Sequence, residues 1–99
     1  MKADRELDAR IAEEVMGHIN FYGGEYIGPH YSTQIADAMP VFDKIIEKEG
    51  IAVITRYAPE GRAHYWEIEW GYRGKKVRSD TLPHTICLAA LAVVERREG

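Results

Sequence analysis

The chain opens with an amphipathic pattern. Apolar side chains recur at every fourth position: Leu7, Ile11 and Val15. Acidic residues fill much of the opposite side, so the spacing predicts a helix over residues 4–16 with one buried face. Asp4 is the expected N-cap, because its carboxylate can accept from the first unpaired amides of the helix. Gly17 is the expected stop, since glycine readily takes the left-handed conformation.

A second helical pattern begins at Ser32 and ends at Gly50. Its apolar positions follow helical spacing: Ile35, Ala38, Met39, Phe42, Ile45 and Ile46. Ser32 is the expected N-cap of this helix. Pro40 lies within the pattern, where it has no N–H to donate and its ring crowds the preceding turn. We therefore expect a kink or break near Met39.

The stretch between these helices, residues 18–31, has no sustained period. Its turn-forming residues are Gly23, Gly24, Gly28 and Pro29, and its aromatic residues are Phe21, Tyr22, Tyr26 and Tyr31. We expect a loop here. Loops of this length in small domains are usually functional or frayed.

Three short runs with strand character follow, over residues 51–57, 64–72 and 76–80. Gly and Pro separate the first two runs, and an Arg-Gly-Lys turn separates the last two, which predicts a meander of antiparallel strands. In the middle run the two Trp residues alternate with Glu67 and Glu69. One face of the sheet is therefore expected in the core and the Glu face in water.

The last pattern, residues 81–95, begins with Pro83 in a first-turn position and is apolar on most sides. It predicts a largely buried helix. The complete chain is therefore expected to be one α+β domain over residues 1–99. A three-stranded antiparallel meander packs against helices in the order α-α-β-β-β-α.

Composition narrows the classes of partner. Thirteen Lys and Arg against 16 Asp and Glu give a net charge of −3, which disfavours nucleic-acid binding. A double-stranded-RNA-binding domain ends with the same order of strands and helix, but the last helix here lacks the basic cluster that would reach phosphates. No apolar run approaches about 18 residues, so we expect no membrane span. Cys87 is the single cysteine, so no internal disulfide is possible and a cytoplasmic location is expected.

Metal and nucleophile patterns are weak. The histidines are His18, His30, His64 and His84. Only His84 and Cys87 have ligand-like spacing, and Cys87 lies in an apolar stripe, so we expect no metal and no cofactor. Ser79 and Asp80 near His84 lack the strained turn that exposes a hydrolase nucleophile. Glu67 and Glu69 have the minimum spacing for paired-carboxylate chemistry, but the solvated face of a half-buried strand is the favoured explanation.

The aromatic loop is the best candidate binding region. Stacking faces and the unpaired amides at the starts of the second and third helices would suit a base and a phosphate. The candidate ligand-binding residues are Tyr22, Tyr26, His30, Tyr31, Ser32 and His84. The alternative is that these aromatics simply cover the sheet or a helix end.

Three stretches resemble one known family. ELDARIAEEVMGH, HYSTQIADAMPVFDKI and SDTLPHTICLAALAVVE occur in the order found in bacteriophage and prophage ABA sandwich domain proteins. The resemblance implies helices packed against a small antiparallel sheet in a phage-encoded accessory protein, with no established reaction. The chain departs from the family pattern at Pro40 and in its glycine-rich loop.

These observations lead to three functional hypotheses. The first is a phage or prophage accessory protein that binds a host or phage protein and catalyses nothing. A homo-oligomer would cover the outer sheet face, where Tyr57 and Tyr65 are expected. The second is a protein that sequesters a small ligand such as a host signalling nucleotide. The third is a small hydrolase using Glu67 and Glu69.

Overall fold

The expected order of elements is confirmed. The structure, a computed structural model, describes residues 1–18 and 21–98, with side chains up to residue 95. The elements are α1 (Arg5–Ile11), its π-helical extension η1 (Ala12–Met16), β1 (Phe21–Tyr22), β2 (Glu25–Tyr26), α2 (Ile35–Glu49), β3 (Ala52–Tyr57), β4 (Tyr65–Trp70), β5 (Lys75–Ser79) and α3 (Leu82–Glu98). The three longer strands form one antiparallel sheet in the order β3-β4-β5.

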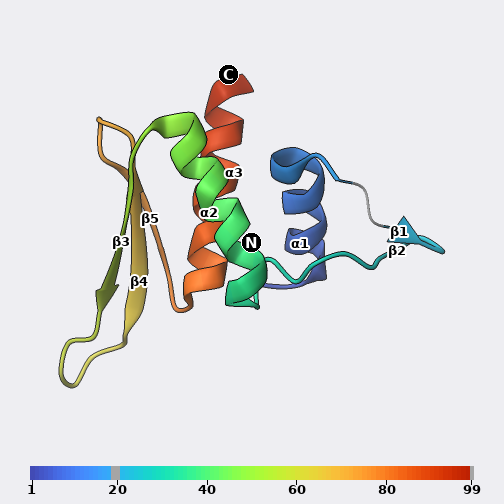
Figure 1. Cartoon of the computed structure of the whole chain (residues 1–99). Helices are drawn as coiled ribbons and strands as arrows, with labels where there is room; N and C mark the ends of the chain where they lie inside the picture. Colours follow the sequence, from blue (N-terminus) through green and yellow to red (C-terminus); the bar gives the residue numbers. More distant parts are fainter. Residues whose placement is uncertain (19–20, 99) are drawn as a thin grey trace.

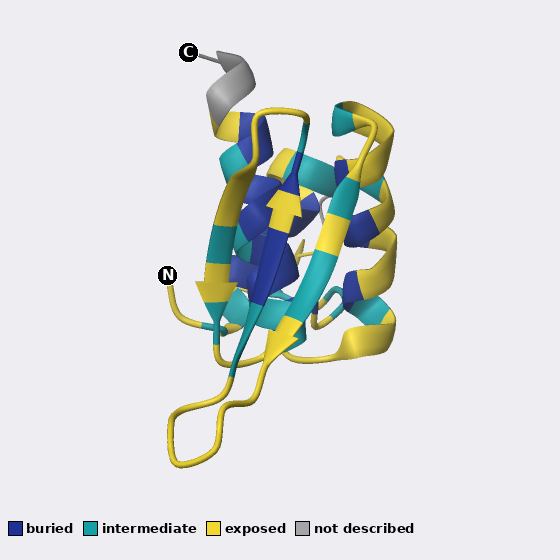
Figure 2. Cartoon of the chain, turned by 90° about the vertical axis from the view of Figure 1, so that its left-hand side faces the viewer, coloured by how far each residue is buried: buried dark blue, intermediate teal, exposed yellow. Residues whose placement is uncertain are grey.

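The elements are arranged in layers (Figure 1). The sheet forms one layer, α2 and α3 form the next, and α1 lies on their far side. α3 therefore packs against β4 and β5 on one side and against α1 and η1 on the other. A helix enclosed from two sides needs apolar residues around most of its circumference, which explains the sequence of α3. The other face of the sheet is open to solvent in Figure 2.

Both predicted ends of the first helix are confirmed. The Asp4 carboxylate accepts a hydrogen bond from the Leu7 N–H at 3.0 Å. Gly17 ends the helix with a φ of +72°, a value that strongly favours glycine. The last turn, η1, is a π-helix, and the His18 N–H donates to the Ala12 carbonyl at 2.7 Å. The apolar spacing gave no sign of this wider turn.

The predicted start of the second helix was wrong. α2 begins at Ile35, after Gln34, and Ser32 caps no helix. The Ser32 side chain is buried, and its hydroxyl donates to the Asp8 carboxylate at 2.7 Å. The ionised Asp8 carboxylate accepts a stronger hydrogen bond from the Ser32 hydroxyl than a neutral backbone N–H would donate to it, so Ser32 turns toward α1.

The predicted break near Met39 was also wrong. α2 continues through Pro40 as one helix from Ile35 to Glu49. Pro40 lies in the second turn and is exposed, so its ring needs no room in the core. The helix loses one hydrogen bond there, and the buried face of α2 compensates for that loss.

The expected loop contains a short hairpin. β1 and β2 pair antiparallel, with Phe21 opposite Tyr26. Gly23 and Gly24 both have positive φ values, +59° and +85°, as a two-residue hairpin turn of type I′ requires. Two-residue strands are too short to produce an alternating pattern, which is why the sequence indicated only a loop.

The prediction for the two faces of β4 is confirmed only in part. Ile68 and Trp70 are buried against the helices, and Trp66 is half-buried. Glu67, expected in water, is only 6% exposed, which corrects the prediction. Arg78 on β5 lies opposite Glu67 and pairs with it, and Tyr57 on β3 donates to the same carboxylate. Long side chains from both neighbouring strands therefore cover Glu67.

Candidate functional site

Arg5 on α1 holds the aromatic loop in place. Its Nη2 donates to the carbonyls of Tyr26 and Gly28, at 3.2 Å and 3.0 Å. Its Nη1 lies 2.8 Å from Nδ1 of His30, and its guanidinium sits 4.6 Å from the centre of the Tyr26 ring. The side chains of Tyr26 and His30 are thus used in internal contacts.

None of the six predicted ligand-binding residues lines the pocket at the turn between β4 and β5. The Tyr26 hydroxyl donates to the Pro29 carbonyl at 2.9 Å, and burial raises the pKa of Tyr26 to about 12. Tyr31 is a buried core residue, and burial raises its pKa also. Tyr22 is largely exposed. The ligand-binding role of these residues stays a prediction.

Two further predicted residues have internal partners. Ser32 is buried, and both its N–H and its hydroxyl donate to Asp8. His84 lies at the start of α3, with Nδ1 2.8 Å from the Ser79 hydroxyl and Nε2 2.6 Å from the Met1 carbonyl. Its two ring nitrogens therefore bind to two separate segments of the chain. Among the described side chains, no three His, Cys, Asp or Glu residues cluster as a metal site would require.

Asp8 is the most completely buried carboxylate of the described residues. It is 1% exposed and accepts from the Ser32 N–H and hydroxyl, each at 2.7 Å, and from Arg5 Nη1 at 3.0 Å. Three donors satisfy the charge. This network connects α1 to the segment before α2, so its role in the described structure is to join two elements.

Glu67 is the centre of a cluster on the outer face of the sheet. It accepts from Arg78 Nε at 2.8 Å and from the Tyr57 hydroxyl at 3.3 Å. The Tyr57 and Tyr65 rings stack at 4.7 Å, and the Arg78 guanidinium lies 5.1 Å from the centre of the Tyr65 ring. The Arg78 hydrogen bond lowers the pKa of Glu67. A general acid needs a raised pKa, so this geometry suits an ion pair better than the hypothesised hydrolase.

Cys87 is buried in the described core. Burial raises the pKa of its thiol to about 12, so the thiol stays protonated at neutral pH. The thiolate is the reactive form of cysteine. The position therefore suits a packing role.

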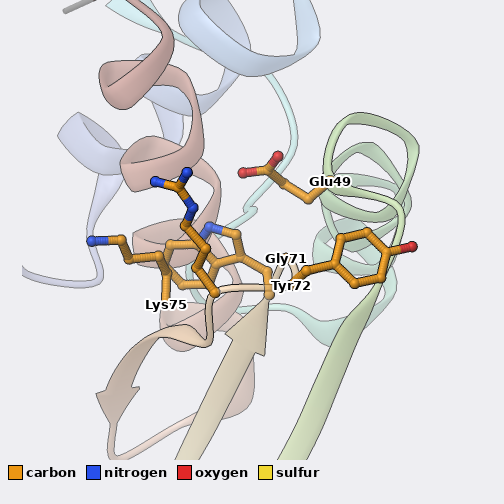
Figure 3. A pocket seen from close by; sticks show the side chains of 6 residues that line it. Glu49, Gly71, Tyr72 and Lys75 are labelled. Carbon is orange, nitrogen blue, oxygen red and sulfur yellow. The ribbon is translucent and has the colours of Figure 1, made fainter.

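A pocket lies at the turn between β4 and β5, beside the end of α2. Its volume is about 460 Å³, and its lining consists of Glu49, Trp70, Gly71, Tyr72, Arg73 and Lys75. Figure 3 shows Glu49 reaching from α2 over the turn and Lys75 on the other side of it. The sequence analysis placed Gly71 and Tyr72 at the end of the middle strand and residues 73–75 in a turn, and it predicted no site there, whereas β4 ends at Trp70. The available signal was an aromatic residue and two cations within residues 71–75, together with Gly71 and Gly74.

The pocket wall contains one buried donor that lacks an acceptor. Trp70 is 3% exposed, and its Nε1 is the one buried side-chain N or O atom without a hydrogen-bond partner among the described side chains. Tyr72 is 89% exposed, although its hydroxyl lies 3.5 Å from the position a Cβ would take on Gly50. The pocket thus combines cations, an exposed ring and an unsatisfied donor.

The comparisons with known proteins agree with this fold. The sequence profile of the phage ABA sandwich domain matches residues 9–91. The chain belongs to this family. The phage ABA sandwich chain is also similar to a phage protein from Bacillus cereus, known from a 2.0 Å crystal structure, with 29% identity and a TM-score of 0.71. The similarity covers 96% of this chain and 89% of that chain. The predicted family and fold class are therefore confirmed.

A search of curated proteins gives no match. None of the described helices of this phage ABA sandwich protein combines the length and the apolar character that a membrane crossing needs.

Proposed function

We propose that this phage protein acts by binding and that it works in the bacterial cytoplasm as a homodimer built on the edge strand β3. The observation that carries the proposal is an uncovered apolar surface where α2 borders β3. The buried free thiol of Cys87 supports a reducing compartment. A further host or phage protein would then bind the assembled dimer.

The first part of this surface is the α2 stripe, which consists of Ile35, Met39 and Ile46. These side chains are between 38% and 46% exposed. Their spacing of four and seven residues places them on one face of the helix. Exposed apolar side chains that continue along one helix face are typical of a protein contact.

The second part is the outer edge of β3. β3 is the end strand of the sheet, and no described strand pairs with its other side. The opposite edge strand, β5, carries three cations, of the kind that protect natural edges from pairing. β3 has one charged residue, Arg56, and exposes Val53 and Tyr57. Figure 2 shows α2 running alongside this edge, and because α2 contacts β3, our proposal treats the stripe and the edge as one surface.

A second copy of the chain suits this surface. Antiparallel pairing of two β3 strands about a two-fold axis gives one continuous six-stranded sheet. If Thr55 of each chain lies opposite Thr55 of the other, Val53 faces Tyr57 on the outer side. The same register keeps the two Arg56 side chains from facing each other. The contact is therefore self-complementary.

Size-exclusion chromatography with light scattering tests the proposal over protein concentrations of about 1–500 µM. We expect a dimer. Met39→Glu places two extra carboxylates in the contact beside Asp43 and Glu47, and we expect dimer affinity to fall by more than about tenfold.

Ile27→Glu is the matched control, because Ile27 is an exposed apolar residue in the hairpin region. We expect this variant to dimerise like the parent chain. A monomer at every concentration contradicts the proposed dimer, and equal weakening by both variants contradicts its location.

A further inference from the structure

We infer that the pocket at the β4–β5 turn binds a small ligand that carries both a phosphate group and a planar ring, the chemistry of a nucleoside monophosphate. This inference rests on the pocket and does not depend on the proposed dimer. The site differs from the one predicted from sequence, because it uses no residue of the aromatic loop.

The size of the pocket fits such a ligand. Its volume of about 460 Å³ lies within the range of small-molecule sites in proteins, about 300–1,000 Å³. It is formed by a turn and a helix end, two places where functional side chains are held on a rigid scaffold. The scaffold here is the paired strands β4 and β5 and the end of α2.

The charges of the pocket favour a phosphate on one side. Arg73 and Lys75 both line the pocket, and both are donors that recognise phosphate oxygens. Glu49 lines it from α2, on the other side of the turn in Figure 3. An anion is therefore favoured near the two cations and disfavoured near Glu49, so the ligand has one preferred orientation.

The remaining wall groups suit a planar ring with hydrogen-bond acceptors. Tyr72 is 89% exposed at the rim, and its hydroxyl lies 3.5 Å from the position that a Cβ would take on Gly50, at the end of α2. Exposed aromatic rings of this kind provide stacking surfaces for bases.

The Trp70 Nε1–H supplies the second observation that points to a ligand. It is a buried donor without an acceptor, and such groups are rare unless a ligand or water supplies one. Because Trp70 lines the pocket and its Nε1 is enclosed, we expect ligand binding to move side chains around the indole.

The indole N–H resonances of ¹⁵N-labelled protein provide a direct test. The chain has two Trp residues, so the signal of Trp66 is an internal control on the opposite part of β4. The probes are AMP, GMP, CMP, UMP, adenosine and inorganic phosphate. We expect at least one nucleotide to shift the Trp70 signal to saturation and to leave Trp66 in place.

Adenosine and inorganic phosphate separate the two halves of the inference. Each should bind at least about tenfold more weakly than the best nucleotide, because each lacks one half of the ligand. Equal binding by phosphate contradicts ring recognition, and equal binding by a nucleoside contradicts the role of the cations. No saturable shift with any probe overturns the site.

Two lysines that are neighbours in sequence provide a matched pair of variants. Lys75→Ala removes a cation that lines the pocket and should weaken nucleotide binding by about tenfold. Lys76→Ala removes the same charge from the other face of β5, opposite Glu69, and should change affinity by less than about twofold. Equal effects of the two variants would show nonspecific charge attraction and contradict the site.

Discussion

Two buried carboxylates, Asp8 and Glu67, are held in different ways. Each pairs with a partly exposed arginine, Asp8 with Arg5 at 3.0 Å and Glu67 with Arg78 at 2.8 Å. The other partners differ. Asp8 also accepts from the buried N–H and hydroxyl of Ser32, 24 residues later in the chain. Glu67 has the Tyr57 hydroxyl, on a strand that already pairs with its own.

The difference shows what each carboxylate contributes. Without Asp8, the Ser32 N–H would remain buried with no acceptor, and the Ser32 hydroxyl would keep only the Asp4 carbonyl, at 3.2 Å. Without Glu67, Arg78 and Tyr57 would turn to water, because both are exposed. A similar depth of burial therefore gives a large effect in one place and a small effect in the other.

Asp8→Ala should have the largest effect. The variant leaves the Ser32 N–H unsatisfied in the core and removes the acceptor of Arg5, while the Ser32 hydroxyl keeps the Asp4 carbonyl at 3.2 Å. We expect the free energy of unfolding to fall by about 2–4 kcal/mol. For a domain of this size the melting temperature should fall by about 10–20 °C. Thermal unfolding followed by circular dichroism measures the change.

Asp43→Ala is the control for this prediction, because Asp43 is an exposed carboxylate on α2. It should change the free energy of unfolding by less than about 0.5 kcal/mol. If the two variants have equal effects, the Asp8 network does not stabilise the fold.

Ser32→Ala should have an intermediate effect. It removes the hydroxyl donor and keeps the backbone N–H bond to Asp8, so the expected loss is about 1 kcal/mol. Urea unfolding gives the change in free energy. A loss as large as that of Asp8→Ala would mean that the hydroxyl carries the whole network, contrary to this account.

Glu67→Gln should have a smaller effect that depends on pH. The folded pKa of Glu67 is lowered, first by Arg78, so the carboxylate stabilises the fold at pH values above its unfolded pKa of about 4.3. This contribution is lost as the pH falls through the folded pKa. The parent should melt at a higher temperature than the variant at pH 7, and the two melting temperatures should be equal near about pH 2. Calorimetry over this range measures the gap in melting temperature, and a gap that does not vary with pH contradicts the assigned ion pair.

Added salt should have the smallest effect on the melting temperatures. It distinguishes the exposed ion pair of Glu67 from the buried network of Asp8. Between about 0.05 M and 1 M NaCl, the gap caused by Glu67→Gln should narrow, because ions screen exposed pairs. The gap caused by Asp8→Ala should persist, since the Ser32 donors are buried. Parallel narrowing of both gaps would show that the two sites are equally accessible to ions.

Much of the fold is predictable because it depends on local patterns. Asp4 and Gly17 limit the first helix through contacts within one turn, and the alternation along β4 places Ile68 and Trp70 inward. The apolar residues around α3 correctly indicated burial on more than one side. Each of these features follows from a period that can be read without knowledge of distant residues.

The remaining features depend on contacts between distant residues. Ser32 has the residue type and the sequence position expected of an N-cap. Only the position of Asp8 in the fold shows that the Ser32 hydroxyl donates to that carboxylate instead. Glu67 occupies a polar strand position, and its burial results from Tyr57 and Arg78 on two other strands. The β4–β5 pocket requires Glu49 to approach the turn, which no spacing within the turn encodes.

The place of α3 between the other layers has a consequence for synthesis on the ribosome. α1, η1, α2, β4 and β5 all precede α3 in the chain, and all of them contact it. While the chain is being translated, the apolar side chains of these elements stay exposed until α3 has left the ribosome. We therefore expect chaperones to bind the exposed apolar surface of the nascent chain. We also expect the layers to form late and in one cooperative step, once α3 is available.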